Sequence, residues 1–153
     1  MNLEIVDGKL HHCGKMARNI RKKQAELPAS YNKAVHREIC NKFKKSTVCR
    51  AALVDGNLVA LGGGISQFLE DTCFVWFCGL ENNIKIKIAI IKELIVNIRK
   101  ILTTKNKVVS LFDLNDKMAI RMANFLGFEV SSNTDHNFGS YVMMEINKEK
   151  FWR

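Results

Sequence analysis

The segment from Lys107 to Val130 has a strong local pattern and predicts a strand, a polar turn, a helix and a second strand. Its first part, Val108–Phe112, is an apolar and β-branched run typical of a strand covered on both faces. Asp113–Asp116 carries side chains that favour turns and helix N-caps, and apolar residues then recur at helical spacing up to Leu126. Gly127 follows directly, and glycine can adopt the left-handed conformation that ends a helix at the least energetic cost. This alternation predicts a sheet with helices packed on it.

The longest predicted helix runs from Ile84 to about Leu102 and carries two adjacent rows of apolar side chains. The first row is Ile84, Ile88, Ile91, Ile95, Ile98 and Leu102, and the second is Ile86, Ile90, Leu94 and Ile101. A stripe of that width needs a sheet to lie on.

The remaining elements follow from shorter patterns. Asp55-Gly56-Asn57 separates two apolar runs and predicts a β-hairpin, and the uncharged segment Thr72–Leu80 predicts a central strand. Residues 1–10 predict an edge strand, two basic amphipathic helices lie between residues 11 and 45, and a last strand covers Tyr141–Ile146. The prediction is one α/β domain, residues 1–153, of the α+β mixed-sheet type, in the order β-α-α-β-β-β-α-β-α-β-β.

The net charge of +9 is concentrated near the N-terminus. Residues 1–50 hold 12 Lys and Arg against 4 Asp and Glu, whereas residues 51–153 hold 12 against 11. This asymmetry indicates an acidic partner, which could be an acidic protein surface, a phosphorylated ligand, or nucleic acid bound through the basic region 15–50. The alternative is that the basic residues are the solvated outer faces of two helices.

The N-terminus has neither a basic start nor a hydrophobic block, and the apolar runs are cut by lysine and asparagine, so no signal peptide or membrane span is predicted. The five cysteines form no C-x-x-C pair, which fits reduced thiols packed as small apolar side chains. We therefore expect a cytoplasmic protein without disulfides.

The pattern N-x-x-x-A-I-R-x-x-x-x-L-G-F, which begins at Asn115, resembles the segment near the end of GNAT-superfamily N-acetyltransferases. It is most similar to the GNAT-like proteins encoded by tailed phages, for which the location would be the host cytoplasm. The resemblance implies an acetyl-coenzyme A-dependent N-acyltransferase acting on an amine of a protein or small molecule. The alternative is a catalytically degenerate GNAT-like module that contacts a host protein, a virion component or nucleic acid through its basic N-terminal helices.

The resemblance also implies where the coenzyme binds. In the family the pyrophosphate lies on the N-terminus of the helix after the fourth strand, because free backbone N–H groups and the helix dipole attract phosphate oxygens. Here this position corresponds to Asn82, Asn83, Ile84 and Lys85, with Lys87 adding positive charge. The glycine-rich loop that family members usually carry at this point is missing.

The catalytic groups are expected at the neighbouring strand ends. Asn115 matches the asparagine that lies beside the pantetheine arm in the family, and Asp113 is on the same turn. Family members often carry a tyrosine as general acid where this chain has Ala123, which leaves Tyr141 as the substitute. Glu81 is the candidate base.

Two other carboxylates, Glu70 and Asp71, lie at the opposite end of the fourth strand and are further candidates for the base. Each of these carboxylates also has a simpler interpretation as a turn or capping residue.

One other group of residues has metal-ligand chemistry, His11-His12-Cys13 together with His36 and Cys40. His36 and Cys40 are four residues apart and therefore share a helical face. The spacing matches no known zinc finger, and packing is the commoner role of such residues, so we predict no metal.

Overall fold

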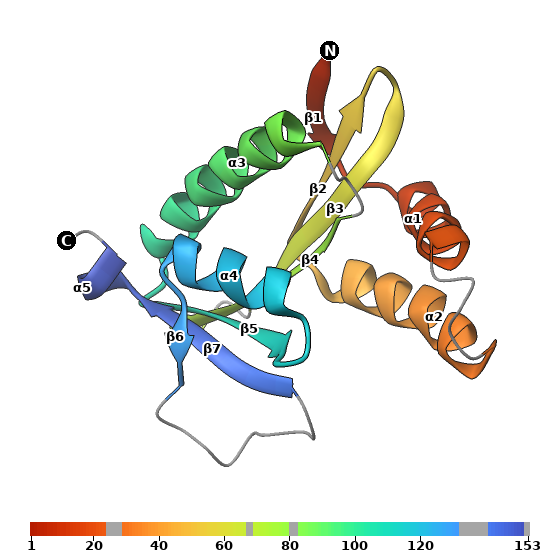
Figure 1. Cartoon of the computed structure of the whole chain (residues 1–153). Helices are drawn as coiled ribbons and strands as arrows, with labels where there is room; N and C mark the ends of the chain where they lie inside the picture. Colours follow the sequence, from red (N-terminus) through yellow and green to blue (C-terminus); the bar gives the residue numbers. More distant parts are fainter. Residues whose placement is uncertain (24–28, 67–68, 80–82, 132–140, 152–153) are drawn as a thin grey trace. The chain divides into compact units, whose positions relative to one another are not determined.

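The computed structural model describes residues 1–23, 29–66, 69–79, 83–131 and 141–151, and of residues 21–35 it describes no side chains. The described elements are β1 (Leu3–Asp7), α1 (Leu10–Lys23), α2 (Ala29–Lys45), β2 (Val48–Val54), β3 (Asn57–Ser66), β4 (Thr72–Gly79), α3 (Ile84–Leu102), β5 (Lys107–Asp113), α4 (Lys117–Leu126), β6 (Glu129–Val130), β7 (Tyr141–Asn147) and α5 (Lys148–Phe151) (Figure 1). The predicted order is confirmed, and α5 is an addition to it.

The strands form a seven-stranded mixed sheet in the order β1-β2-β3-β4-β5-β7-β6, which confirms the predicted fold class and the central position of β4. The chain divides into two compact units, residues 1–65 with 76–90, and residues 66–75 with 91–153. The assignment of residues 1–153 to one domain stays a prediction.

The first unit is built on the antiparallel strands β1, β2 and β3. Asp55 and Gly56 connect β2 to β3 with φ of 49° and 80°, the left-handed values that a tight hairpin turn needs. The four consecutive residues from Leu58 to Leu61 are all buried, so both faces of β3 are covered. In Figure 1, α1 and α2 lie on one side of these strands and the first turns of α3 on the other.

The glycines of β3 allow close packing. A Cβ on Gly63 would lie 2.8 Å from both the Val48 carbonyl oxygen and Trp76 Nε1. Trp76 Nε1 in turn donates to Ser46 Oγ at 2.8 Å, and Ser46 Oγ donates to the Lys42 carbonyl oxygen at 2.6 Å. These contacts connect β4 to the C-terminal end of α2 in the space that the missing side chain leaves.

The second unit has its core between the C-terminal half of α3, α4, β5 and β7. The buried residues of this core are Ile98, Leu102, Val108, Ala123, Leu126, Phe128, Val142, Met144 and Ile146. Helix α4 has the predicted caps, since Asp116 Oδ1 accepts from Ala119 N at 3.1 Å and Gly127 is left-handed with φ 96°.

The predicted apolar rows of α3 need a correction. The first row is buried at Ile98 and Leu102, but Ile84 and Ile88 at its N-terminal end are 66% and 48% exposed. The second row supplies the burial there, through Ile86 and its neighbour Ile90. Because a straight helix has 3.6 residues per turn, a row with a repeat of seven drifts around the helix and leaves the buried face within a few turns.

Candidate functional site

The parallel ladder between β4 and β5 is short. It contains three pairs, Thr72–Phe74 with Lys107–Val109, although β4 continues to Gly79 and β5 to Asp113. Directly after the last pair, the buried Ser110 donates its hydroxyl to the Val75 carbonyl oxygen at 2.7 Å. The Ser110 side chain therefore bonds a carbonyl of β4 just beyond the last pair of the ladder.

The N-terminus of α3 is capped by the chain itself. Asn83 Oδ1 accepts from Lys85 N at 2.9 Å, and the Asn83 carbonyl oxygen accepts from Lys87 N at 3.0 Å. Asn83, Ile84 and Lys85 are exposed, and Lys87 is half-buried. The predicted phosphate-binding end of this helix is thus accessible, and one of its first N–H groups is bonded to an asparagine side chain.

The turn after β5 places three predicted site residues together. Asp113 Oδ1 accepts from Asn115 N at 3.0 Å, which fixes the turn, and the Asn115 side chain is exposed. Tyr141 is the ladder partner of Asp113 at the start of β7. Cross-strand partners have Cβ atoms within about 5.5 Å, so β7 does bring the Tyr141 side chain close to this turn. Tyr141 is 42% exposed.

The remaining predicted site residues are not near this turn in sequence. Glu81 and Asn82 lie outside the described residues. Asp71 lies beside the paired end of β4, where its carbonyl oxygen accepts from Asn106 N and Lys107 N. Glu70 and Asp71 thus lie at the end of β4 that is distant in sequence from α3, and their role as candidate bases stays a prediction.

Ala123, which stands where family members often carry a tyrosine, is fully buried in the core.

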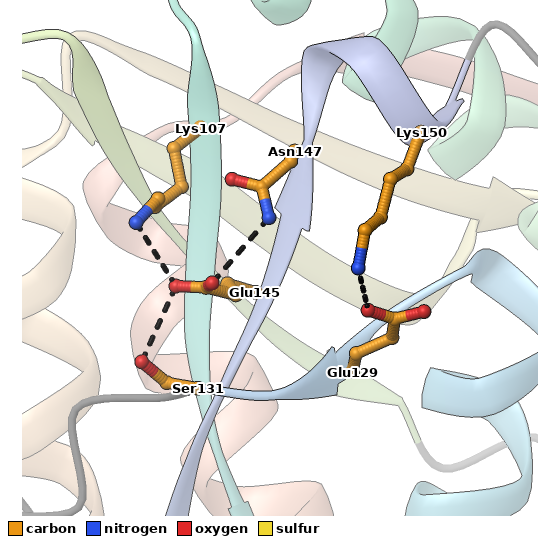
Figure 2. A network of polar contacts seen from close by, with 6 residues as sticks. All are labelled: Lys107, Glu129, Ser131, Glu145, Asn147 and Lys150. Carbon is orange, nitrogen blue, oxygen red and sulfur yellow. Dashed lines mark hydrogen bonds and ion pairs between the residues drawn. The ribbon is translucent and has the colours of Figure 1, made fainter.

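Glu145 on β7 accepts hydrogen bonds from three side chains (Figure 2). It accepts from Lys107 Nζ at 3.1 Å, from Ser131 Oγ at 3.2 Å and from Asn147 Nδ2 at 3.4 Å. Burial by itself raises the pKa of this carboxyl, but the hydrogen bond and charge of Lys107, with the other two donors, outweigh burial and lower the pKa of Glu145. Through Lys107 and Ser131, Glu145 connects β7 to β5 and to the residue that follows β6.

No group of three His, Cys, Asp or Glu side chains in the described part of the chain has a geometry that could hold a metal ion. His36 Nε2 lies 3.4 Å from Cys40 Sγ, so the predicted shared helical face is confirmed. His12 Nδ1 accepts instead from Lys9 N at 2.9 Å, at the start of α1.

Sequence reasoning missed Ser110. The available signal was a single hydroxyl residue inside the apolar run Val108–Phe112, which is unusual in a strand covered on both faces. Nothing in the pattern itself indicates which carbonyl that hydroxyl meets.

No family model matches the chain, and no curated protein matches its sequence. Among the residues that the structure describes, no helix is both long and apolar enough to span a membrane. Comparison with solved structures defines the fold class as that of the GNAT-family acetyltransferases, which match nearly the whole chain.

Three of these structures illustrate the likeness. A chimera of the Vibrio cholerae spermidine N-acetyltransferase SpeG and hSSAT has a TM-score of 0.69 and 9% identity, with 100% of this chain and 99% of that chain covered. Mycobacterium smegmatis RimJ in complex with CoA-disulfide has a TM-score of 0.69 and 11% identity, with coverage of 99% and 84%. The PaiA N-acetyltransferase of Thermoplasma acidophilum, in complex with coenzyme A, has a TM-score of 0.65 and 13% identity, with coverage of 96% and 99%.

Proposed function

We propose that this chain is an acetyl-coenzyme A-dependent N-acyltransferase of the GNAT type, acting on an amine of a protein or small molecule. The observation that carries the proposal is the β4–β5 ladder, which stops after three pairs, so that the later residues of β5 have no partner in that ladder. Backbone groups at such a strand end can hydrogen-bond an extended amide-bearing ligand, as the pantetheine arm is. Coenzyme complexes of two proteins with this fold support the same assignment.

The residues at the start of α3 fit the pyrophosphate with one rearrangement. The exposed first turn offers backbone N–H groups at the positive end of a helix that runs from Ile84 to Leu102, and Lys85 and Lys87 add two cations. Asn83 Oδ1 now accepts from Lys85 N, so a phosphate oxygen would replace that contact with a stronger, charged acceptor. In the proposed site the Asn83 side chain, a cap that phosphate can displace, stands where the family has its glycine loop. Asn82 precedes it in sequence and belongs to the same proposed site.

The chemistry needs few groups. The acceptor amine, once deprotonated, attacks the thioester carbonyl carbon; a C–N bond forms, the C–S bond breaks, and the thiolate takes a proton. We assign the proton donor to Tyr141, which lies opposite Asp113 on the turn that carries Asn115. Asn115 would hold the pantetheine arm, and Glu81 would take the amine proton directly or through water.

Isothermal titration calorimetry with acetyl-coenzyme A tests the proposal. Binding in the micromolar range is the expected result, and release of free thiol in the presence of polyamine and peptide amines would then identify the acceptor class. Spermidine is a reasonable first polyamine because a protein with this fold is named for it. Absence of binding at millimolar coenzyme would overturn the transferase.

A second candidate function is a non-catalytic binding module of GNAT fold, which uses its basic N-terminal helices to contact an acidic protein or nucleic acid. Two observations favour it: Asn83 already occupies Lys85 N, and the buried Ala123 replaces the usual tyrosine. This candidate predicts no coenzyme binding together with salt-dependent binding to a polyanion such as duplex DNA, because phosphate contacts release counterions. A phage origin belongs to either candidate, and a host protein or virion component as partner belongs to this one.

A further inference from the structure

Helix α1 and the turn between β2 and β3 border a hollow of about 260 Å³ within the first unit. The residues that line it are Lys15, Arg18 and Asn19 on α1, and Gly56, Asn57 and Leu58 at the turn and the start of β3. Among the described residues that line this hollow, two are cations, two carry side-chain amides and none is acidic. The composition of the lining therefore suits an anionic ligand.

The two cations lie on one face of α1. Lys15 and Arg18 are three residues apart and Asn19 is four residues after Lys15, so the three side chains are neighbours on the helix surface. Lys15 and Arg18 are exposed, and within the described part of the chain neither forms an ion pair with a carboxylate. Both charges can therefore act on a ligand in the hollow.

The turn forms the other side of the hollow. Asn19 Nδ2 donates to the Leu58 carbonyl oxygen at 3.5 Å, a long contact that joins α1 to the start of β3. An amide nitrogen carries two N–H groups, so Asn19 can donate a second bond to a ligand. Gly56 has φ 80°, and a Cβ there would meet no atom within 4 Å, so there is free space beside the turn. The acid next to this turn, Asp55, accepts from Asn2 N at 2.9 Å and does not line the hollow.

We propose that this hollow binds the phosphate group of a small molecule. A phosphate monoester has a charge of about −1.5 to −2 at neutral pH, which Lys15 and Arg18 together neutralise. The forked N–H groups of arginine match two phosphate oxygens, and lysine adds a point charge beside them. The amide groups of Asn19 and Asn57 supply further N–H donors.

The size of the hollow favours a small phosphorylated molecule over nucleic acid. Its 260 Å³ is slightly below the roughly 300–1,000 Å³ of most small-molecule pockets, so it has room for one phosphate and a short attached group. Nucleic acid presents a row of phosphates and binds through a matching row of cations. Here two cations meet at one hollow, which fits a single phosphate.

The test is a titration of the full-length, ¹⁵N-labelled chain with glycerol 3-phosphate at constant ionic strength, followed by two-dimensional amide NMR. The amide signals of Gly56, Asn57 and residues 15–19 are expected to shift along one saturable curve. Glycerol is the uncharged control and should shift none of them.

Two variants test the cations separately. Arg18→Gln and Lys15→Gln should each weaken binding of glycerol 3-phosphate by about tenfold, because each removes a charge-assisted hydrogen bond. Both side chains are exposed, so the fold should be retained, and the NMR spectrum itself shows whether it is. Lys44→Gln is the matched control, since it removes the same charge from an exposed position of α2 that does not line the hollow. It should leave the Kd unchanged.

The proposal is overturned if no saturable shift occurs around the hollow, or if Lys44→Gln weakens binding as much as Arg18→Gln does. It is also overturned if duplex DNA shifts these amide signals and glycerol 3-phosphate does not. Shifts confined to the amides of Lys85 and Lys87 would contradict it too, because they would place the phosphate at the start of α3. The titration contains no coenzyme and the signals identify the site, so this proposal and the transferase can fail separately.

Discussion

Replacing Asn83 by glycine is the sharpest test of the coenzyme site. Asn83 Oδ1 accepts from Lys85 N at 2.9 Å, so a phosphate that binds this N–H must first displace the asparagine side chain. An N-cap hydrogen bond of this kind stabilises a helix by about 1 kcal/mol. Removing the competitor should therefore strengthen coenzyme binding by up to about 1 kcal/mol, which is a factor of about five in Kd.

The same substitution has a small and separate effect on stability. Glycine at an N-cap costs only a few tenths of a kcal/mol relative to asparagine, so the midpoint of urea unfolding should move little. Asn97→Ala is the matched control, because Asn97 lies in the same helix and donates to the Glu93 carbonyl oxygen, far along α3 from the proposed phosphate position. It should leave the Kd for coenzyme A unchanged.

The assay is calorimetric titration of wild-type, Asn83→Gly and Asn97→Ala chains with coenzyme A under one buffer and salt concentration. Weaker binding by Asn83→Gly would refute the reasoning, since it would mean that the asparagine holds the ligand rather than competing with it. Equal affinities in all three chains would place the phosphates elsewhere.

Three further predictions concern other parts of the molecule. Glu145→Gln should lower the free energy of unfolding by about 1–3 kcal/mol at neutral pH. Because folding lowers the pKa of Glu145, its contribution to stability is present above the ordinary pKa of 4.5 and is lost as pH falls through the folded-state pKa. The free energies of unfolding of wild type and variant should therefore become equal in acid. Tyr141→Phe should lower kcat for thiol release and leave the Kd for coenzyme A unchanged, and an unchanged kcat would exclude Tyr141 as proton donor. Gly63→Ala should cost about 1–3 kcal/mol in urea unfolding because its Cβ would press on Val48 and Trp76, whereas Gly56→Asn, in an open left-handed turn, should cost little.

Local patterns predicted the elements well, because each depends on residues close in sequence. The turn at Asp55 and Gly56, the helix stop at Gly127 and the bounds of α3 all follow from backbone preferences or periodicity, and the structure confirms them. The same is true of the turn that holds Asn115, where the Asp113 side chain acts on a backbone N–H two residues away.

What could not be predicted depends on partners distant in sequence. Ser110 and Val75 are 35 residues apart, and only the sheet pairing brings hydroxyl and carbonyl together.

The apolar pattern alone assigned Ile84 to the buried face of α3, but Ile84 is exposed. Its exposure depends on which face of the helix lies against the strands, and the spacing of apolar residues does not specify that face.

The hydroxyl-to-carbonyl contact that ends the β4–β5 ladder should be visible in amide hydrogen exchange. Backbone protons of β5 that point toward β4 are protected by pairing only as far as Val109, whereas those directed at β7 are bonded along the whole strand. Deuterium should therefore enter Ser110–Asp113 at alternate positions, giving a fast and a slow set within one strand. A ligand that lies along β5 would slow exchange only at the fast positions. The exchange rates would therefore show whether an acyl carrier binds along this strand.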